Sequence, residues 1–255
     1  SDKPTERKAV LGQLGALYAG RLQRRAEARD AYRQALALDP SFIPALLFFA
    51  DDALERGDTG AALAHLKRLS ALPEGELPRD ERAEILFRLA QLHRRAGRHD
   101  ESEQKAFQAI ELRPDHEGAL LLLEERYQHG ERWAELVEIL RRRADLAQDP
   151  LDRQALLARR ARLLDEVLGE TGKALPAYLD LVRLAPSPDA CIRLAALVLE
   201  HEAFRDVYDV APVLGRALID ADRAAEAAPI LEFATGRGAG ELLDFEQDEL
   251  PRFAG

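Results

Sequence analysis

The segment Ala83–Pro114 constrains the fold of this chain more than any other stretch. In its first half, Leu86 and Leu89 recur at helical spacing on one apolar face, and Gly97 then interrupts the pattern. Its second half has another apolar stripe, which includes the small residue Ala106 and ends before the proline. The segment therefore predicts two amphipathic helices joined by a tight turn, with small side chains that let them approach closely.

Prolines recur through the chain at a similar interval. They stand at Pro40, Pro73, Pro114, Pro150 and Pro186, with spacings of 33, 41, 36 and 36 residues. The longest interval contains an insertion, Pro73–Asp80. Two helical patterns with a turn between them precede each proline. Because one helix pair cannot bury its apolar face alone, we expect the pairs to stack around a continuous core.

The repeated unit resembles the tetratricopeptide repeat, a helix–turn–helix of about 34 residues. That family favours Leu-Gly-x-x-Tyr in the first helix, Ala, an aromatic residue and Ala in the second, and a closing Pro. The residues that carry the resemblance are Leu14, Gly15, Tyr18, Ala28, Tyr32, Ala35 and Pro40, then Ala50, Gly57, Ala62 and Leu66, then Leu89, Ala90, Gly97, Ala109 and Pro114, then Leu123, Tyr127 and Trp133, and finally Gly169, Ala174, Tyr178 and Pro186. The resemblance implies an all-α fold, a right-handed α–α superhelical solenoid of about six helix pairs.

We expect this solenoid to cover residues 8–237 and an acidic tail to cover residues 238–255. The predicted repeats are approximately 8–40, 43–73, 81–114, 117–150, 155–186 and 189–237. The last is irregular, because Pro212 interrupts the pattern of the helix that should follow Asp189–His201. A regular pair with a capping helix and an irregular packing are both compatible with this stretch.

Composition disfavours several other functions. The formal net charge of −10 argues against a nucleic-acid-binding protein, although arginines cluster in two predicted helices. The single cysteine, Cys191, excludes an intramolecular disulfide framework. No histidine pair has metal-ligand spacing, and none lies beside the cysteine. We therefore predict no enzyme, no metal site and no cofactor.

Further expectations concern location and origin. No apolar run approaches the roughly 18 residues that span a bilayer, and no signal peptide is visible, so we expect a cytoplasmic protein without membrane insertion. Methionine is absent, even from position 1, so we expect a processed or trimmed piece of a longer protein. The composition, rich in Ala, Arg and Leu and poor in Lys, is typical of a high-GC bacterial source. The oligomeric state is left open.

The resemblance also implies a concave groove, lined by the first helix of each pair, in which partners bind. The groove residues expected from the repeat frame are Phe48, Phe87, Arg88, Gln91, Arg95, Leu122, Arg159, Arg160 and Arg193. Arginine suits paired hydrogen bonds to carboxylates, so an acidic peptide with hydrophobic anchors is the expected ligand. Alternatively, these arginines are an ordinary solvated helix face, balanced by Glu84, Glu125 and Glu166.

The sequence thus predicts a protein–protein interaction scaffold that binds a partner segment in its groove. The alternative is a regulatory module whose acidic tail occupies the basic groove until a partner displaces it. The flexible composition of residues 236–240, GRGAG, and the charge of the tail motivate this alternative.

Overall fold

The computed structural model describes residues 3–236, which contain thirteen α-helices and no strand. This confirms the prediction of an all-α helical-repeat solenoid. The chain forms two compact units, Ser1–Arg126 (unit 1) and Tyr127–Gly255 (unit 2). The predicted acidic tail, residues 238–255, lies outside the described residues.

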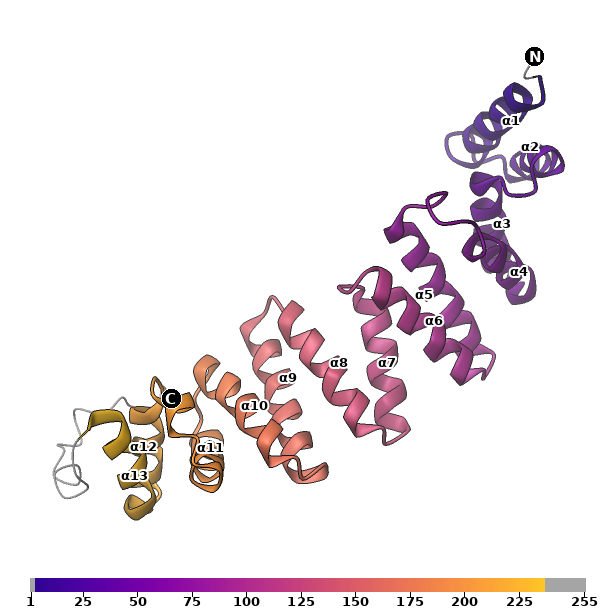
Figure 1. The fold of residues 1–255 in the computed structure, drawn as a ribbon. Coiled ribbons are helices and arrows are strands. Elements are labelled where there is room, and N and C mark those ends of the chain that lie inside the picture. Colours follow the sequence, from indigo (N-terminus) through magenta and orange to yellow (C-terminus); the bar gives the residue numbers. More distant parts are fainter. Residues whose placement is uncertain (1–2, 237–255) are drawn as a thin grey trace. The chain divides into compact units, whose positions relative to one another are not determined.

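Unit 1 is built from helices that pack chiefly against their neighbours in sequence (Figure 1). Its helices are α1 (Lys3–Ala19), α2 (Arg25–Leu38), α3 (Ile43–Glu55), α4 (Thr59–Ser70), α5 (Arg79–Arg95), α6 (His99–Leu112) and α7 (Glu117–His129). The division between the units falls inside α7. The hairpin α5–α6 is the one expected from Ala83–Pro114.

Unit 2 continues the succession of helices and adds two short irregular turns. Its elements are α8 (Trp133–Leu146), α9 (Pro150–Arg162), the π-helix η1 (Leu163–Val167), α10 (Thr171–Leu184), α11 (Pro188–His201), the 3₁₀-helix η2 (Phe204–Val207), α12 (Ala211–Asp220) and α13 (Ala224–Thr235). Pro150 and Pro188 lie at the starts of α9 and α11, where a missing backbone N–H is tolerated.

One backbone hydrogen bond recurs in the turns between the helices of a pair. In the α5–α6 turn, the N–H of Arg98 donates to the carbonyl of His93 at 2.9 Å, and Gly97 takes the left-handed conformation with φ +71°. In the α7–α8 turn, the N–H of Arg132 donates to the carbonyl of Tyr127 at 2.9 Å, and Glu131 takes φ +52° without being glycine. The same turn therefore forms with or without glycine at the left-handed position, although glycine adopts that conformation more readily.

The same turn explains the irregular end of the solenoid. The N–H of Ala203 donates to the carbonyl of Val198 at 3.0 Å, as in the other turns, so α11 ends like the first helix of a pair. The short η2 then stands where a second helix would begin. A new pair, α12–α13, follows, and Pro212 lies at the start of α12. The irregular last repeat predicted from the sequence is thus a shortened helix pair, α11 and η2, followed by a regular pair, α12 and α13.

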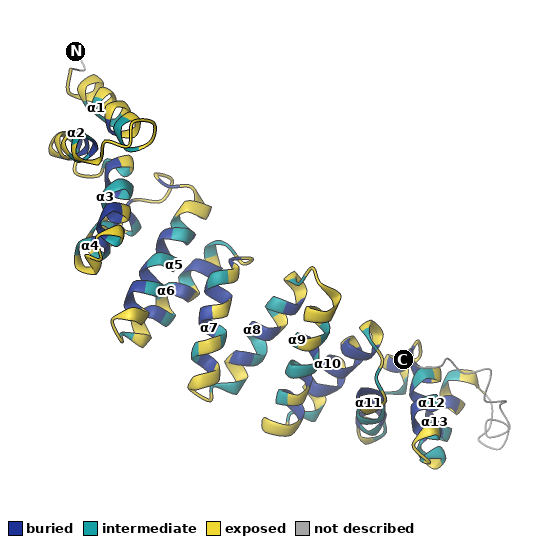
Figure 2. Cartoon of the chain, turned by 180° about the vertical axis from the view of Figure 1, so that it is seen from behind, coloured by how far each residue is buried: buried dark blue, intermediate teal, exposed yellow. Residues whose placement is uncertain are grey.

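Small residues bring the helices into close contact. Figure 2 shows the buried positions on the sides of the helices that face one another. Ala28 and Ala35 of α2 and Ala50 of α3 are fully buried. A Cβ on Gly15 of α1 would lie 2.7 Å from the ring of Tyr32 in α2. Glycine is therefore required at this position by a neighbouring side chain.

We expect Gly15→Ala to destabilise unit 1 by about 1 kcal/mol. Overpacking costs about 1–3 kcal/mol, and the better helix propensity of alanine offsets up to about 1 kcal/mol of it. Urea unfolding followed by far-UV circular dichroism measures the change. Gly60→Ala is the matched control, because its nearest neighbour, an oxygen of Asp58, would lie 3.6 Å away. A Gly15→Ala variant as stable as the wild type would contradict the close approach.

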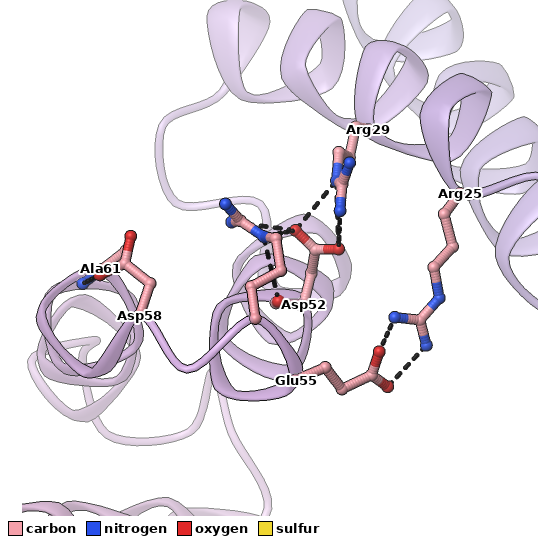
Figure 3. A network of polar contacts seen from close by, with 7 residues as sticks. Arg25, Arg29, Asp52, Glu55, Asp58 and Ala61 are labelled. Carbon is pink, nitrogen blue, oxygen red and sulfur yellow. Dashed lines mark hydrogen bonds and ion pairs between the residues drawn. The ribbon is translucent and has the colours of Figure 1, made fainter.

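A buried carboxylate joins the first two helix pairs (Figure 3). The side chain of Asp52 in α3 is 1% exposed, and it accepts hydrogen bonds of 2.7–3.1 Å from Arg29 of α2. Arg56, the residue that directly follows α3, donates to the same carboxylate at 3.1 Å. These hydrogen bonds, those from Arg29 above all, hold the pKa of the Asp52 carboxyl below its usual range.

Candidate protein-binding surface

The nine predicted groove residues are divided between the two units. Phe48 (α3), Phe87, Arg88, Gln91 and Arg95 (α5) and Leu122 (α7) lie in unit 1, whereas Arg159 and Arg160 (α9) and Arg193 (α11) lie in unit 2. The structure therefore presents two separate sets, one on each unit.

Ion pairs join the helices α3, α5 and α7 of unit 1. Arg88 of α5 donates to Asp51 of α3 at 2.6 Å and lies 3.4 Å from Glu84 of its own helix. Further along α5, Arg94 pairs with Glu125 of α7. Glu84 and Glu125 are thus two of the balancing acids that the sequence suggested. The positive charge expected in the middle of the groove is largely compensated within the protein.

The two phenylalanines among the predicted groove residues are interhelical packing groups. The ring of Phe48 lies 4.8 Å from that of Tyr32 in the preceding pair. The ring of Phe87 lies 4.6 Å from that of His116, and a Cβ on Gly118 of α7 would come within 2.5 Å of the same ring. Both phenylalanines are half-buried. Phe48 thus packs against the preceding repeat and Phe87 against the following one, and each ring stays partly exposed.

The predicted exposure of Leu122 is wrong. Its side chain is 6% exposed, whereas that of the preceding Leu121 is 44% exposed. The four consecutive leucines of α7 obscure the helical period, so the repeat frame does not distinguish the outward leucine from its neighbour. Leu121 is therefore the exposed one of these two leucines of α7.

The α3–α5–α7 surface is defined here as Asp51, Arg88, Gln91, Arg94, Arg95, Leu121 and Glu125. Within the described residues, Arg95 is exposed and forms no ion pair, and the side chain of Gln91 forms no hydrogen bond. The surface thus combines a row of ion-paired side chains with one arginine that has no ion pair, Arg95, and one exposed leucine, Leu121.

A buried histidine supports the start of α7 beside this surface. His116 is 4% exposed, and its Nδ1 accepts a hydrogen bond of 3.3 Å from the backbone N–H of Ala119. Its Nε2 lies 3.4 Å from Glu84. Burial lowers the pKa of His116 most, and Arg113 acts in the same direction. The neutral ring is thus a structural group that holds Phe87 and the helix start together.

In unit 2, Arg193 is bound to the protein itself. It donates two hydrogen bonds of 2.5 and 2.6 Å to Asp165, whose side chain is 5% exposed. The partner acid in the structure is Asp165, next to the Glu166 suggested by the sequence. Asp165 lies in η1, where the π-helical turn changes the direction of the side chains relative to an α-helix. Arg193 therefore has a structural role between two repeats.

Arg159 and Arg160 do not form one cationic patch. Arg159 donates to the side chain of Gln128 in α7 at 3.0 Å and lines a cavity with Arg162. Arg160 lines a different cavity, which also contains Arg153. Arg153 is not among the predicted groove residues, although Arg153, Leu157 and Arg160 recur at the i, i+4, i+7 spacing of one helix face.

Three further observations concern metal ligands, the cysteine and the membrane. No group of three or more His, Cys, Asp or Glu side chains between residues 3 and 236 is placed to hold a metal ion. Cys191 is fully buried, and burial raises the pKa of its thiol to about 11, so the reactive thiolate is disfavoured at neutral pH. None of the helices described is long and apolar enough to cross a membrane.

Successive helix hairpins with a common turn define a helical-repeat protein. A tetratricopeptide repeat family model matches residues 9–42 and 83–116, which include most of α1–α2 and of α5–α6. A second model, also of the tetratricopeptide repeat, matches residues 119–154, which include most of α7 and all of α8. These matches identify tetratricopeptide repeats over residues 9–42, 83–116 and 119–154 of the chain. Members of this family bind proteins or peptides, and the chain is a protein-interaction scaffold of this class.

Solved structures provide further comparisons. A tetratricopeptide repeat protein from Parabacteroides merdae is 19% identical, with a TM-score of 0.43 over 89% of this chain and 82% of that one. The Pseudomonas aeruginosa protein pilF is 18% identical, with a TM-score of 0.42 over 95% and 99%. A chain of the APC/C hetero-tetramer Cut9–Hcn1 is 16% identical, with a TM-score of 0.41 over 92% of this chain, which spans only 44% of that one. No curated protein sequence matches the chain.

Proposed function

We propose that the α3–α5–α7 surface of unit 1 binds a segment of a partner protein. The observation that carries this proposal is the row of side chains that crosses three consecutive first helices, ordered by the Asp51–Arg88 and Arg94–Glu125 pairs. Ion pairs that already fix their side chains reduce the entropy lost when a partner binds. The row therefore supplies a preorganised polar strip next to Arg95 and Leu121.

The charges of this surface define the partner that fits it. Arg88 and Arg94 are paired with acids, so a strongly acidic segment would meet Asp51 and Glu125 as well as the arginines. The surface fits a segment with a carboxylate for Arg95 and an apolar side chain for Leu121. The proposed partner segment therefore has one acidic residue and one hydrophobic anchor. This is more specific than the acidic peptide with hydrophobic anchors expected from the sequence.

The alternative function places the acidic tail in this groove. The tail lies outside the described residues, and the acids that compensate Arg88 and Arg94 would repel it. This alternative therefore has less support on this surface than a partner segment does.

Site-specific photo-crosslinking tests the proposal. A benzophenone amino acid replaces Gln91 on the surface or, as the matched control, the exposed Gln104 on α6. We expect discrete protein adducts from position 91 in a lysate of the source organism and none of the same adducts from position 104. Arg95→Glu should weaken the captured partner's affinity by about tenfold, which corresponds to about 1.4 kcal/mol.

Two results would contradict the proposal. Equal adducts from positions 91 and 104 would place the interaction on another face. An affinity unchanged by Arg95→Glu, with the helix content preserved, would remove the uncompensated cation from the binding surface.

A further inference from the structure

A second candidate binding site lies in unit 2, between α8, α9 and α10. The cavity has a volume of about 530 Å³, which is within the usual range of ligand pockets. It is lined by four arginines, two aspartates and two leucines: Arg141, Arg153, Arg160, Arg183, Asp145, Asp180, Leu157 and Leu184.

Two of the four arginines lack hydrogen-bond acceptors. The side chain of Arg160 is 16% exposed, and its closest carboxylate, Asp180, is 3.8 Å away. The Nε of Arg160 is shielded from solvent and has no hydrogen-bond partner. Arg153, which is exposed, forms no hydrogen bond or ion pair with the described residues. Buried donors normally find acceptors, so the Nε of Arg160 is an unsatisfied donor, with Asp180 beyond hydrogen-bond distance, and Arg153 adds an exposed cation that is not paired with a described carboxylate.

The other two arginines are already paired. Arg141 bonds to Glu138 and Asp145, at 2.8–3.2 Å. Arg183 donates two hydrogen bonds of 2.8 Å to Asp209. The arginines without a hydrogen-bond acceptor are therefore both on α9, where Arg153 and Arg160 line the cavity.

The positions of these residues on α9 indicate the kind of ligand. Arg153 and Arg160 are seven residues apart, which corresponds to about 10 Å along the helix axis. Leu157 lies between them on the same face, and Leu184 of α10, which is 37% exposed, adds apolar surface. A ligand that fits has carboxylates interspersed with apolar side chains, as an acidic peptide segment does.

We propose that this cavity takes the acidic segment of the same chain, Glu241–Glu249. Its sequence, ELLDFEQDE, has five acidic residues and three apolar ones. The complementarity of charge and of apolar content favours this occupant over a purely ionic one. The inference concerns a different unit and different residues from the proposed partner surface, and it does not rest on that function.

The segment is long enough to reach the cavity. It begins five residues after Gly236, the last residue described. Helix α13 packs against α11, and α11 packs against α10, which borders the cavity. Two helix spacings amount to about 16–20 Å, whereas the chain can span up to about 18 Å from Gly236 to Glu241 and up to about 32 Å from Gly236 to Phe245, so the middle of the segment can reach the cavity. The covalent link gives an effective concentration in the millimolar range, so modest attraction suffices for binding.

Photo-crosslinking within the full chain tests this inference. A benzophenone amino acid replaces Phe245, and the adducts are mapped by mass spectrometry after irradiation at low protein concentration. We expect intramolecular crosslinks to residues in 141–160 and 180–184. Arg153→Glu should lower their yield at least fivefold, because it reverses an exposed charge and leaves the core untouched. High salt should lower the yield as well, since screening weakens exposed ion pairs.

The matched control is Arg162→Glu, on the same helix but lining the other cavity. It is exposed, like Arg153, and changes the net charge equally. An equal loss of crosslinks in both variants would overturn the inference, because only the overall charge would matter. Crosslinks to the α3–α5–α7 surface, crosslinks only between two chains, or no crosslinks at all would overturn it too. A failure of the partner test at Gln91 leaves these outcomes unaffected.

Discussion

Replacing Asp52 by alanine is expected to lower the free energy of unfolding of unit 1 by about 3 kcal/mol. Removing one member of a buried ion pair costs about 3–5 kcal/mol, because the remaining charge loses its partner. Arg29 and Arg56 retain partial exposure, with side chains 34% and 51% exposed, so the lower end of that range applies. The guanidinium groups of Arg29 and Arg56 both donate hydrogen bonds to the one carboxylate, and Figure 3 shows Arg29 pointing toward Asp52.

Urea unfolding of the variant, followed by circular dichroism, measures this loss. Asp51→Ala is the control, because the carboxylate of Asp51 is 53% exposed and pairs with Arg88. An exposed pair contributes about 0–1 kcal/mol, so the two variants should differ clearly. Similar losses for Asp51→Ala and Asp52→Ala would show that the burial of Asp52 has no energetic consequence.

The pH dependence of the same pair has a definite sign. The pKa of Asp52 is lowered in the folded protein, chiefly by hydrogen bonds from Arg29, whereas an unfolded Asp titrates near about 3.9. Its contribution is therefore complete above that unfolded value and is lost as the pH falls through the folded pKa. The stability difference between wild type and Asp52→Ala should be constant from about pH 5 to pH 8 and should shrink below about pH 4. A difference that grows on acidification would refute the assignment.

The repeat pattern of the sequence predicts the helices well, because their apolar period is local information. The hairpin around Gly97 and the helix start at Trp133 both follow from it. Turns at Gln23 and Glu131 are harder to predict, since both take a positive φ without being glycine. There the hydrogen bonds and packing of the adjoining helices select a backbone conformation that the side chain does not favour.

The proposed binding surface is less predictable, because it depends on contacts between distant residues. Arg88 and Asp51 are 37 residues apart, and only the stacking of successive helix pairs, with α4 packed against both α3 and α5, brings them together. Helical spacing also treats Arg159 and Arg160 alike, although they line different cavities. The repeat pattern identifies the helix that carries a side chain. A shift of one residue along that helix, which turns the side chain by about 100°, decides whether it forms an ion pair, packs in the core or is exposed to solvent.

Arg193 shows the same limit and leads to the second large expected effect. The repeat frame places it in the groove, yet it donates two hydrogen bonds to Asp165 from a helix 28 residues further along the chain. The extra residue in the π-helical turn of η1 shifts the helical period just where Asp165 lies. A period of 3.6 residues therefore cannot predict this pair.

Arg193→Ala is expected to destabilise unit 2 by about 3 kcal/mol, because it leaves the carboxylate of Asp165 buried without its cation. Hydrogen bonds from Arg193 are the main reason that the pKa of Asp165 is lowered. Without them, burial should raise that pKa, so that the loss of stability is largest near neutral pH and smaller on acidification. Urea unfolding at several pH values measures this trend.

A double-mutant cycle separates the structural role of Arg193 from a binding role. The variant Arg193→Ala with Asp165→Ala should be more stable than Arg193→Ala alone, because no unpaired charge stays in the interior. Arg162→Ala, which removes an exposed arginine of α9, should change the stability by less than about 0.5 kcal/mol. If Arg193→Ala instead lost a partner at unchanged stability, Arg193 would belong to a binding groove, and the pair with Asp165 would have no role in holding the repeats together.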